Sequence, residues 1–193
     1  MIIGITGGTG CGKTTLLELI GQLGGKVLDC DAIYHQLLQT DEKMLYALEN
    51  AFPQAFEEGK LDRKKLGKLV FADKEALAQL NQITHSAVKD KVLQLLEREN
   101  GLVGIDAIGL FEGGLAELCD VTVAVIAPEE LRLQRLIARE NISEEYALSR
   151  IRAQKNNEYF TGLCDHFLVN DGTKEQFREK CLAFFREQGI IKA

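Results

Sequence analysis

Short runs of apolar, mostly β-branched residues alternate along the chain with segments whose apolar residues recur every three or four positions. The short runs predict strands at Ile2–Thr6, Lys26–Asp29, Leu102–Asp106, Val121–Ile126 and His166–Val169. Helical patterns follow most of these strands, an alternation typical of a doubly wound parallel sheet. The pattern therefore predicts an α/β fold in three layers, with helices on both faces of a parallel sheet of about five strands.

The segment between the second and third predicted strands is far longer than an ordinary crossover connection. Its apolar residues form two helical stripes, with Leu66, Leu69 and Val70 in one and Ile83, Ala87, Val88, Val92, Leu95 and Leu96 in the other. We therefore expect a helical domain inserted into the sheet core. Such an insertion is a natural place for a second substrate.

Directly after the first predicted strand, the stretch GGTGCGKTT fits the phosphate-loop pattern G-x-x-x-x-G-K-[ST]. Glycines let the backbone turn tightly and direct its N–H groups at an anion, which the dipole of the following helix also attracts. We expect Lys13 to reach the β- and γ-phosphates of ATP and the Thr14 hydroxyl to ligate Mg²⁺. A glycine-rich turn can be purely structural, but the flanking strand and helix favour phosphate binding. The predicted nucleotide-binding residues are Gly8, Thr9, Gly10, Cys11, Gly12, Lys13, Thr14 and Thr15.

Cys11 occupies a position of this motif that phosphate binding leaves unconstrained. The helix dipole and the Lys13 ammonium both favour a thiolate there, so we expect Cys11 to be more reactive than an ordinary buried cysteine. Alkylation of Cys11 is then expected to inactivate the protein, and Mg-ATP to protect it. The chain has five cysteines, an odd number with no C-x-x-C pair, which favours free thiols in the reducing cytoplasm.

Acidic residues follow two of the predicted strands, at the edge where open α/β folds bind ligands. The second strand leads to Asp31, which either accepts the proton of an attacking hydroxyl or caps the next helix. Asp106 ends the third strand, and we expect it to lie close to Mg²⁺. Glu112, a few residues on, either belongs to the active site or merely begins the next helix.

Five of the nine arginines fall between residues 132 and 152, just after the expected helix start at Pro128. Arg132, Arg135 and Arg139 are spaced by three and four, so they share a helix face. A guanidinium placed over the γ-phosphate would compensate the charge of the transition state, although neighbouring glutamates also allow an ion-paired, solvated surface. We favour a lid, in which Arg132 should matter much less than Arg139 if it is paired at the surface.

The charge and hydropathy of the chain argue against nucleic acid and membrane as binding partners. The formal net charge of −6 argues against a dedicated nucleic-acid binder. No apolar run reaches the length of a membrane span, and the first residues lack a basic region and a cleavage site. We expect a cytoplasmic monomer that acts on a small molecule.

Together these elements resemble the dephospho-coenzyme A kinase family, nearly from end to end. The matching stretches are the phosphate loop, VLDCDAIYH, GKLDRKKLGKLVF, LNQITHSAV, RLQRLIAREN, SRIRAQ and FLVNDG. The resemblance implies transfer of the ATP γ-phosphate to the ribose 3′-hydroxyl of dephospho-coenzyme A, the last step of coenzyme A synthesis. It also implies three parts, which are a core at about 1–30, 101–127 and 161–193, a helical coenzyme A domain at about 31–100, and a lid at about 128–160.

The same resemblance implies roles for single residues. It makes Asp31 the general base and Arg139 the lid arginine, with Lys13 also catalytic. The other family positions near the substrates are Arg63, His85 and Glu112 on the acceptor side and Asn170 on the adenine side. Without the resemblance, His85 would be more simply explained as a structural histidine near a helix start.

One departure affects the acceptor side. The family usually reads Pro-Leu-Leu-Phe-Glu where this chain has Ile108, Gly109, Leu110, Phe111 and Glu112. Loss of the proline and gain of a glycine give the backbone before Glu112 more conformational freedom.

The nearest alternative function is that of a nucleoside monophosphate kinase of the same fold, which should have a shorter insertion. A GTP-dependent switch would carry an Asn-Lys-x-Asp motif, and the sequence has none.

Overall fold

The computed structural model describes residues 1–192, which divide into two compact units. The first, here called the sheet unit, consists of Met1–Leu28, Gly101–Phe111 and the chain from Ala116 onward. The second, here called the helical unit, consists of Asp29–Asn100 and Glu112–Leu115. Each unit has its own packing and is described separately.

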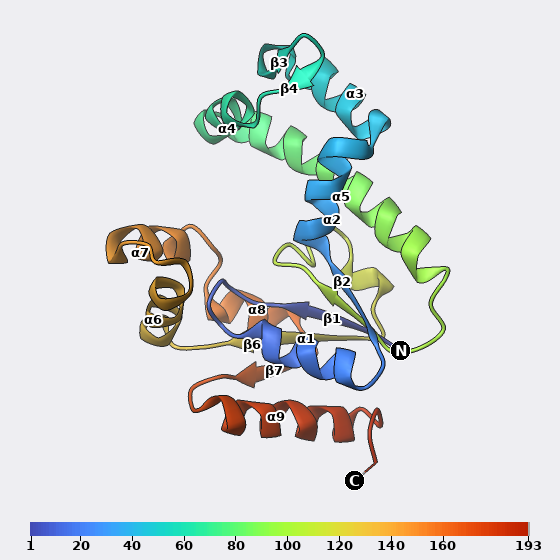
Figure 1. Ribbon diagram of the computed structural model, residues 1–193, viewed down its shortest axis with the longest axis vertical. Helices are drawn as coiled ribbons and strands as arrows, with labels where there is room; N and C mark the ends of the chain where they lie inside the picture. Colours follow the sequence, from blue (N-terminus) through green and yellow to red (C-terminus); the bar gives the residue numbers. More distant parts are fainter. Residues whose placement is uncertain (193) are drawn as a thin grey trace. The chain divides into compact units, whose positions relative to one another are not determined.

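The sheet unit is built on a five-stranded parallel sheet in the order β2-β5-β1-β6-β7 (Figure 1). The strands are β1 (Ile2–Thr6), β2 (Lys26–Asp29), β5 (Val103–Asp106), β6 (Val121–Ile126) and β7 (His166–Val169). The predicted sheet is confirmed, and only β5 differs, beginning one residue later than expected. In the central strand, Ile5 pairs with Asp106 of β5 and Thr6 with Ala124 of β6. The segments that follow β1, β5 and β6 therefore leave the sheet at one edge.

The helices of the sheet unit are α1 (Lys13–Gln22), α6 (Glu129–Glu140), α7 (Glu144–Arg152), α8 (Asn157–Leu163) and α9 (Lys174–Glu187), with a short 3-10 turn η2 (Ala116–Leu118). Helices α1 and α9 lie side by side, and α8 packs against β6 (Figure 1). Ile3, Ile5, Ile20 and Phe185, all fully buried, form part of the core between α1, α9 and the sheet. Burying apolar side chains in this way is the main force that holds helices on the sheet.

Two helix starts in the sheet unit are well defined, and the predicted one at Pro128 is confirmed. Pro128 precedes α6, which begins at Glu129 with two acidic residues in its first turn. Before α9, the Thr173 side chain accepts from the Gln176 backbone while the Gln176 side chain accepts from the Thr173 backbone. This capping box satisfies N–H groups that a helix start leaves without partners.

The helical unit contains α2 (Cys30–Thr40), α3 (Glu42–Ala51), η1 (Pro53–Ala55), α4 (Arg63–Ala72) and α5 (Lys74–Leu96). Helix α5 is the central helix of this unit, because α2, α3 and α4 all pack against it. A short antiparallel hairpin, β3 (Phe56–Glu57) with β4 (Lys60–Leu61), was not predicted. Its turn places Glu58 and Gly59 at positive φ, and Glu-Gly is a weaker hairpin signal than Asn-Gly or Asp-Gly. Within residues 1–192, no helix combines the length and apolar character that a membrane crossing requires.

Candidate functional site

The loop between β1 and α1 has the conformation that anion binding requires. Gly7, Gly10 and Gly12 have φ values of 135°, 76° and 95°, which side-chain-bearing residues rarely adopt. A Cβ at Gly7 would overlap the Val125 carbonyl, and a Cβ at Gly12 would overlap the Asn170 amide. Neighbouring groups of the sheet unit therefore pack directly against the loop backbone. The loop leads into the N-terminus of α1 at Lys13. A helix start leaves N–H groups without intrahelical partners, and these can donate to a phosphate. In the first turn of α1, the Thr15 N–H donates to the Gly12 carbonyl at 3.2 Å.

Lys13 and Asp106 lie together beside this loop. The Lys13 ammonium donates to the Gly7 carbonyl at 2.9 Å and lies 4.0 Å from Asp106 Oδ1. Asp106 is there because β5 pairs with β1 and ends beside the loop. Thr14, in the first turn of α1, is exposed.

The donor set fits Mg²⁺. The Thr14 hydroxyl and the Asp106 carboxylate are hard oxygen ligands of the kind that Mg²⁺ prefers. Among residues 1–192, no group of three or more His, Cys, Asp or Glu side chains could hold a metal. A magnesium ion in a kinase site is bound through one or two protein oxygens together with the substrate phosphates, so it does not need such a group.

Arg132 of α6 lies against the outer side of the loop, and only 5% of its surface is exposed. Its Nε donates to the Thr9 carbonyl at 2.9 Å, and its Nη2 donates to Gln154 Oε1 at 3.1 Å. The expected surface pairing of Arg132 is therefore wrong. The reason is that α6 packs on a loop without side chains at this point, since a Cβ at Gly8 would overlap the guanidinium.

A second arginine of α6 holds the loop together with Asn170, which follows β7. The Asn170 amide donates to the Cys11 carbonyl at 2.9 Å, and its Oδ1 accepts from Arg135 Nη2 at 3.1 Å. Arg135 Nη1 also lies 3.4 Å from the Gly10 carbonyl. The Asn170 side chain thus binds the loop through Nδ2 and Arg135 through Oδ1, and an adenine contact by this residue remains a prediction. The sequence signal for Arg132 and Arg135 was their helical spacing, but Gln154, in the stretch SRIRAQ, gave none.

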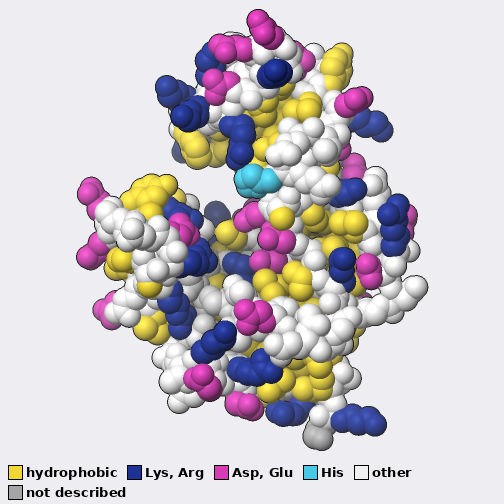
Figure 2. Space-filling model, in the orientation of Figure 1, with side chains coloured by type: hydrophobic (Ala, Val, Ile, Leu, Met, Phe, Trp, Pro, Cys, Tyr) yellow, Lys and Arg dark blue, Asp and Glu magenta, His cyan; other side chains and the backbone are white. Residues whose placement is uncertain are grey.

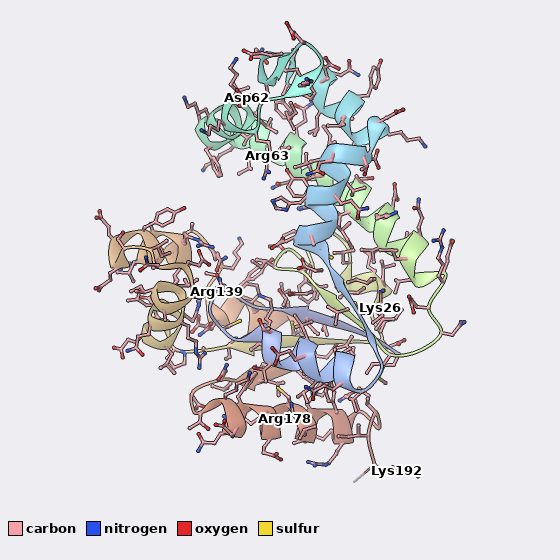
Figure 3. All side chains as sticks on the ribbon, in the orientation of Figure 1. Lys26, Asp62, Arg63, Arg139, Arg178 and Lys192 are labelled. Carbon is pink, nitrogen blue, oxygen red and sulfur yellow. The ribbon has the colours of Figure 1, made fainter. Side chains whose placement is uncertain are left out.

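Arg139 is placed differently from the other two. It lies at the end of α6 (Figure 3), more than half of its side chain is exposed, and it forms an ion pair with Glu140. Glu140 also pairs with Arg150 of α7, and hydrogen bonds from Arg139 and then Arg150 lower the pKa of this carboxyl. Figure 2 shows Lys and Arg side chains gathered over α6 and α7. We call these two helices, residues 129–152, the arginine arm.

The Cys11 side chain is buried in the core of the sheet unit. Its surface is 1% exposed, and it belongs to the apolar core of the sheet unit. Burial raises the pKa of the thiol, and the nearby Lys13 charge and backbone hydrogen bond only partly oppose this. The expected reactive thiolate is therefore wrong, because the free position of the motif turns its side chain into the core.

In the helical unit, α2 begins with two aspartates that have different tasks. Asp29 is the N-cap, and its side chain accepts from the Ala32 backbone N–H at 2.9 Å. The alternative that Asp31 caps this helix is therefore wrong. Asp31 lies in the first turn and is exposed, so its carboxylate is accessible from solvent.

His35 and Arg63 lie on the same side of the helical unit as Asp31. Arg63, the first residue of α4 (Figure 3), places its Nη2 3.2 Å from His35 Nε2. His35 Nδ1 lies 2.7 Å from the Asp31 carbonyl. This geometry fits a neutral imidazole whose Nδ1–H donates to the carbonyl while Nε2 accepts from the guanidinium. His35, which the sequence did not single out, thereby connects the Asp31 backbone to Arg63.

His85 and Glu112 share a hollow of about 540 Å³ in the helical unit. The other residues that line this hollow are Ala78, Asn81, Gln82, Gly113 and Gly114. His85 lies in the middle of α5, so its interpretation as a helix-start histidine is wrong. Glu112 lies in a turn and begins no helix, which removes the structural alternative for this residue.

Comparisons with known proteins cover nearly the whole chain. The family model for dephospho-CoA kinase matches residues 1–176. The chain is 35% identical over 192 residues to the dephospho-CoA kinase of Carboxydothermus hydrogenoformans, covering 96% of this chain and 93% of that relative. It is similar to a crystal structure from Thermus thermophilus, with a TM-score of 0.81, 36% identity and 97% of each chain covered. The dephospho-CoA kinase structure from Campylobacter jejuni gives a TM-score of 0.69, 30% identity and 98% coverage of each chain.

Proposed function

The chain belongs to the dephospho-CoA kinase family, and we propose that it transfers the γ-phosphate of ATP to the ribose 3′-hydroxyl of dephospho-CoA. The products are coenzyme A and ADP. The observation that best supports ATP as the phosphate donor is the glycine-rich loop, with Lys13 and Asp106 beside it. We assign ATP to this loop and dephospho-CoA to the helical unit.

On the donor side, phosphoryl transfer is mainly a matter of position and charge. The N–H groups at the start of α1 and the Lys13 ammonium bind and orient the phosphates. Thr14 and Asp106 are the residues that would hold Mg²⁺, which when bound neutralises charge on the β- and γ-phosphate oxygens. We assign Arg139 of the arginine arm to the charge that develops on the transferred phosphoryl group, because it is the exposed arginine of α6.

On the acceptor side, the attacking hydroxyl must lose a proton. We propose that the Asp31 carboxylate accepts that proton. Asp29 forms the cap of α2, so the Asp31 carboxylate is not needed for capping. Arg63, His85 and Glu112 are assigned to binding of the acceptor, with Arg63 oriented by His35. Because one chain supplies residues for both substrates, we further propose that a monomer is active.

The cysteines support a reducing location. All five lie within the described residues, and none of them forms a disulfide there. Disulfides are rare in the cytosol and common in oxidising compartments. We therefore propose that the protein works in the cytoplasm.

An acceptor panel tests the function. ADP release is measured with Mg-ATP and each of dephospho-CoA, AMP, CMP and shikimate, and the product is identified by mass spectrometry. Dephospho-CoA should be strongly preferred, and the added phosphate should be on the 3′-hydroxyl. A preference for AMP or CMP would instead identify a nucleoside monophosphate kinase.

A further inference from the structure

The backbone of Thr9 is held on both sides by side chains from distant parts of the sheet unit. Its carbonyl accepts from Arg132 Nε at 2.9 Å, and its N–H donates to Gln154 Oε1 at 2.8 Å. Arg132 Nη2 donates to the same Gln154 oxygen at 3.1 Å, which closes a triangle. Both backbone polar groups of Thr9, which belong to two successive peptide units, are thus fixed from outside the loop. We call Arg132 and Gln154 the clasp.

The clasp brings a positive charge to the loop, and the Glu129 carboxylate, in the first turn of α6, compensates this charge only through space, without a hydrogen bond. Arg132 is 5% exposed, and burying a guanidinium is costly unless it is hydrogen bonded. The two oxygens that accept its hydrogen bonds, on Thr9 and Gln154, are both uncharged. Since a charge in a water-poor environment acts more strongly on its neighbours, the guanidinium favours an anion in the adjacent loop.

The loop is also shaped to admit this side chain. A Cβ at Gly8 would overlap the Arg132 guanidinium, and a Cβ at Gly10 would lie 2.7 Å from the Arg132 carbonyl. Glycine at these two positions therefore serves the approach of α6 as well as the bending of the loop. The Gln154 amide and the Arg132 guanidinium can both reach the backbone of Thr9 only because the flanking glycines have no side chains.

We propose that Arg132 and Gln154 are positioning residues for ATP, which fix the backbone of Thr9 in the phosphate loop and place behind it a positive charge that no hydrogen-bonded carboxylate neutralises. The inference rests on the proposed binding of ATP at this loop. It assigns no contact between either side chain and the nucleotide. Their effect passes through the loop backbone and through the charge.

The decisive variant is Gln154→Glu. A glutamate can still accept both hydrogen bonds, but its charge neutralises the guanidinium of Arg132. A merely structural pair would be kept or strengthened by this change, whereas the clasp would lose its attraction for phosphate. We expect the Kd for Mg-ATP, measured by calorimetry, to rise about tenfold, the effect of removing roughly one partly screened charge. The KM for dephospho-CoA should change less than twofold.

The sheet unit supplies a matched control. Gln22 Oε1 accepts from Arg178 Nη2 at 2.9 Å between α1 and α9, in the same pairing of an arginine with a glutamine. Gln22→Glu should leave the Kd for Mg-ATP unchanged. Arg132→Lys keeps the charge but cannot reproduce both hydrogen bonds, so it separates geometry from charge and should weaken Mg-ATP binding less than Arg132→Gln.

The outcomes separate the two levels of the proposal. If Gln154→Glu binds Mg-ATP as tightly as the wild type, and urea unfolding shows it to be folded, the clasp is overturned while the kinase function stands. An equal rise in Kd for Gln154→Glu and Gln22→Glu would also overturn it, because the effect would then be one of net charge. If the wild type itself does not bind Mg-ATP, the proposed function fails and the clasp with it.

Discussion

Replacing Asp31 by asparagine separates chemistry from helix capping at the start of α2. The cap itself does not depend on this residue, because Asp29 accepts the hydrogen bond from the Ala32 backbone. Asn has nearly the shape of Asp but cannot take up a proton from an attacking hydroxyl. If Asp31 is the general base, kcat should fall by about 10²–10⁴-fold, the usual contribution of a positioned base.

The stability effect of the same change is small by comparison. Asp31 is exposed in the first turn of α2, where loss of its charge removes a favourable interaction with the helix dipole worth about 0.3–1 kcal/mol. A thousandfold loss of kcat corresponds to about 4 kcal/mol in the activation free energy. The two effects therefore differ enough to be measured on one variant, by steady-state kinetics and by urea unfolding.

Asp29 provides the control for this experiment. Asp29→Ala removes the cap and should lower the free energy of unfolding by about 1 kcal/mol, whereas Asp29→Asn should be nearly neutral because asparagine caps as well as aspartate. Neither change should approach the loss of kcat in Asp31→Asn. A loss below about threefold in Asp31→Asn, or equal losses in the asparagine variants at both positions, would refute the general-base assignment.

Two further predictions concern side chains near the loop. Arg139→Ala should lower kcat by on the order of 10³-fold, as for other arginines that act in phosphoryl transfer, whereas Arg150→Ala removes the other partner of Glu140 and should have little effect. Equal, small losses of kcat for both variants in a coupled kinase assay would show that Arg139 only forms a surface ion pair. For Cys11, iodoacetamide at neutral pH should leave the folded enzyme active, since burial raises the pKa of the thiol. Rapid loss of activity with Cys11 as the alkylated residue in peptide mapping would contradict the buried placement.

The sheet and the phosphate loop were predictable because each depends on a short stretch of sequence. Four strands have the predicted bounds. For β1 and β6 the reason is that a buried parallel strand is a continuous apolar run between turn residues. The hairpin at β3 and β4 was missed because its strands have only two residues each. The two aspartates at the start of α2 could not be separated, because both residues are good caps and only the true helix start decides between them.

The direction of side chains around the loop could not be read from the sequence. The motif leaves Cys11 unconstrained, and only the packing of the core turns it inward. Likewise, Gln154 lies after α7 and far along the chain from Thr9, so no local pattern connects them. Contacts of this kind depend on how α6 and α7 return to the sheet, which is a property of the whole unit.

The arginines of α6 show where a helical pattern stops being informative. At about 100° per residue, positions 132, 135 and 139 lie within roughly 60° of one another, so the pattern correctly placed them on one face. Their distance along the axis differs more, because at about 1.5 Å per residue Arg139 lies roughly 10 Å beyond Arg132. The loop is reached by Arg132 and Arg135, while Arg139 extends to where α7 returns and pairs with Glu140. An arm that is bound to the loop near its base and has an exposed, weakly held arginine at its far end needs to break only surface ion pairs to redirect Arg139.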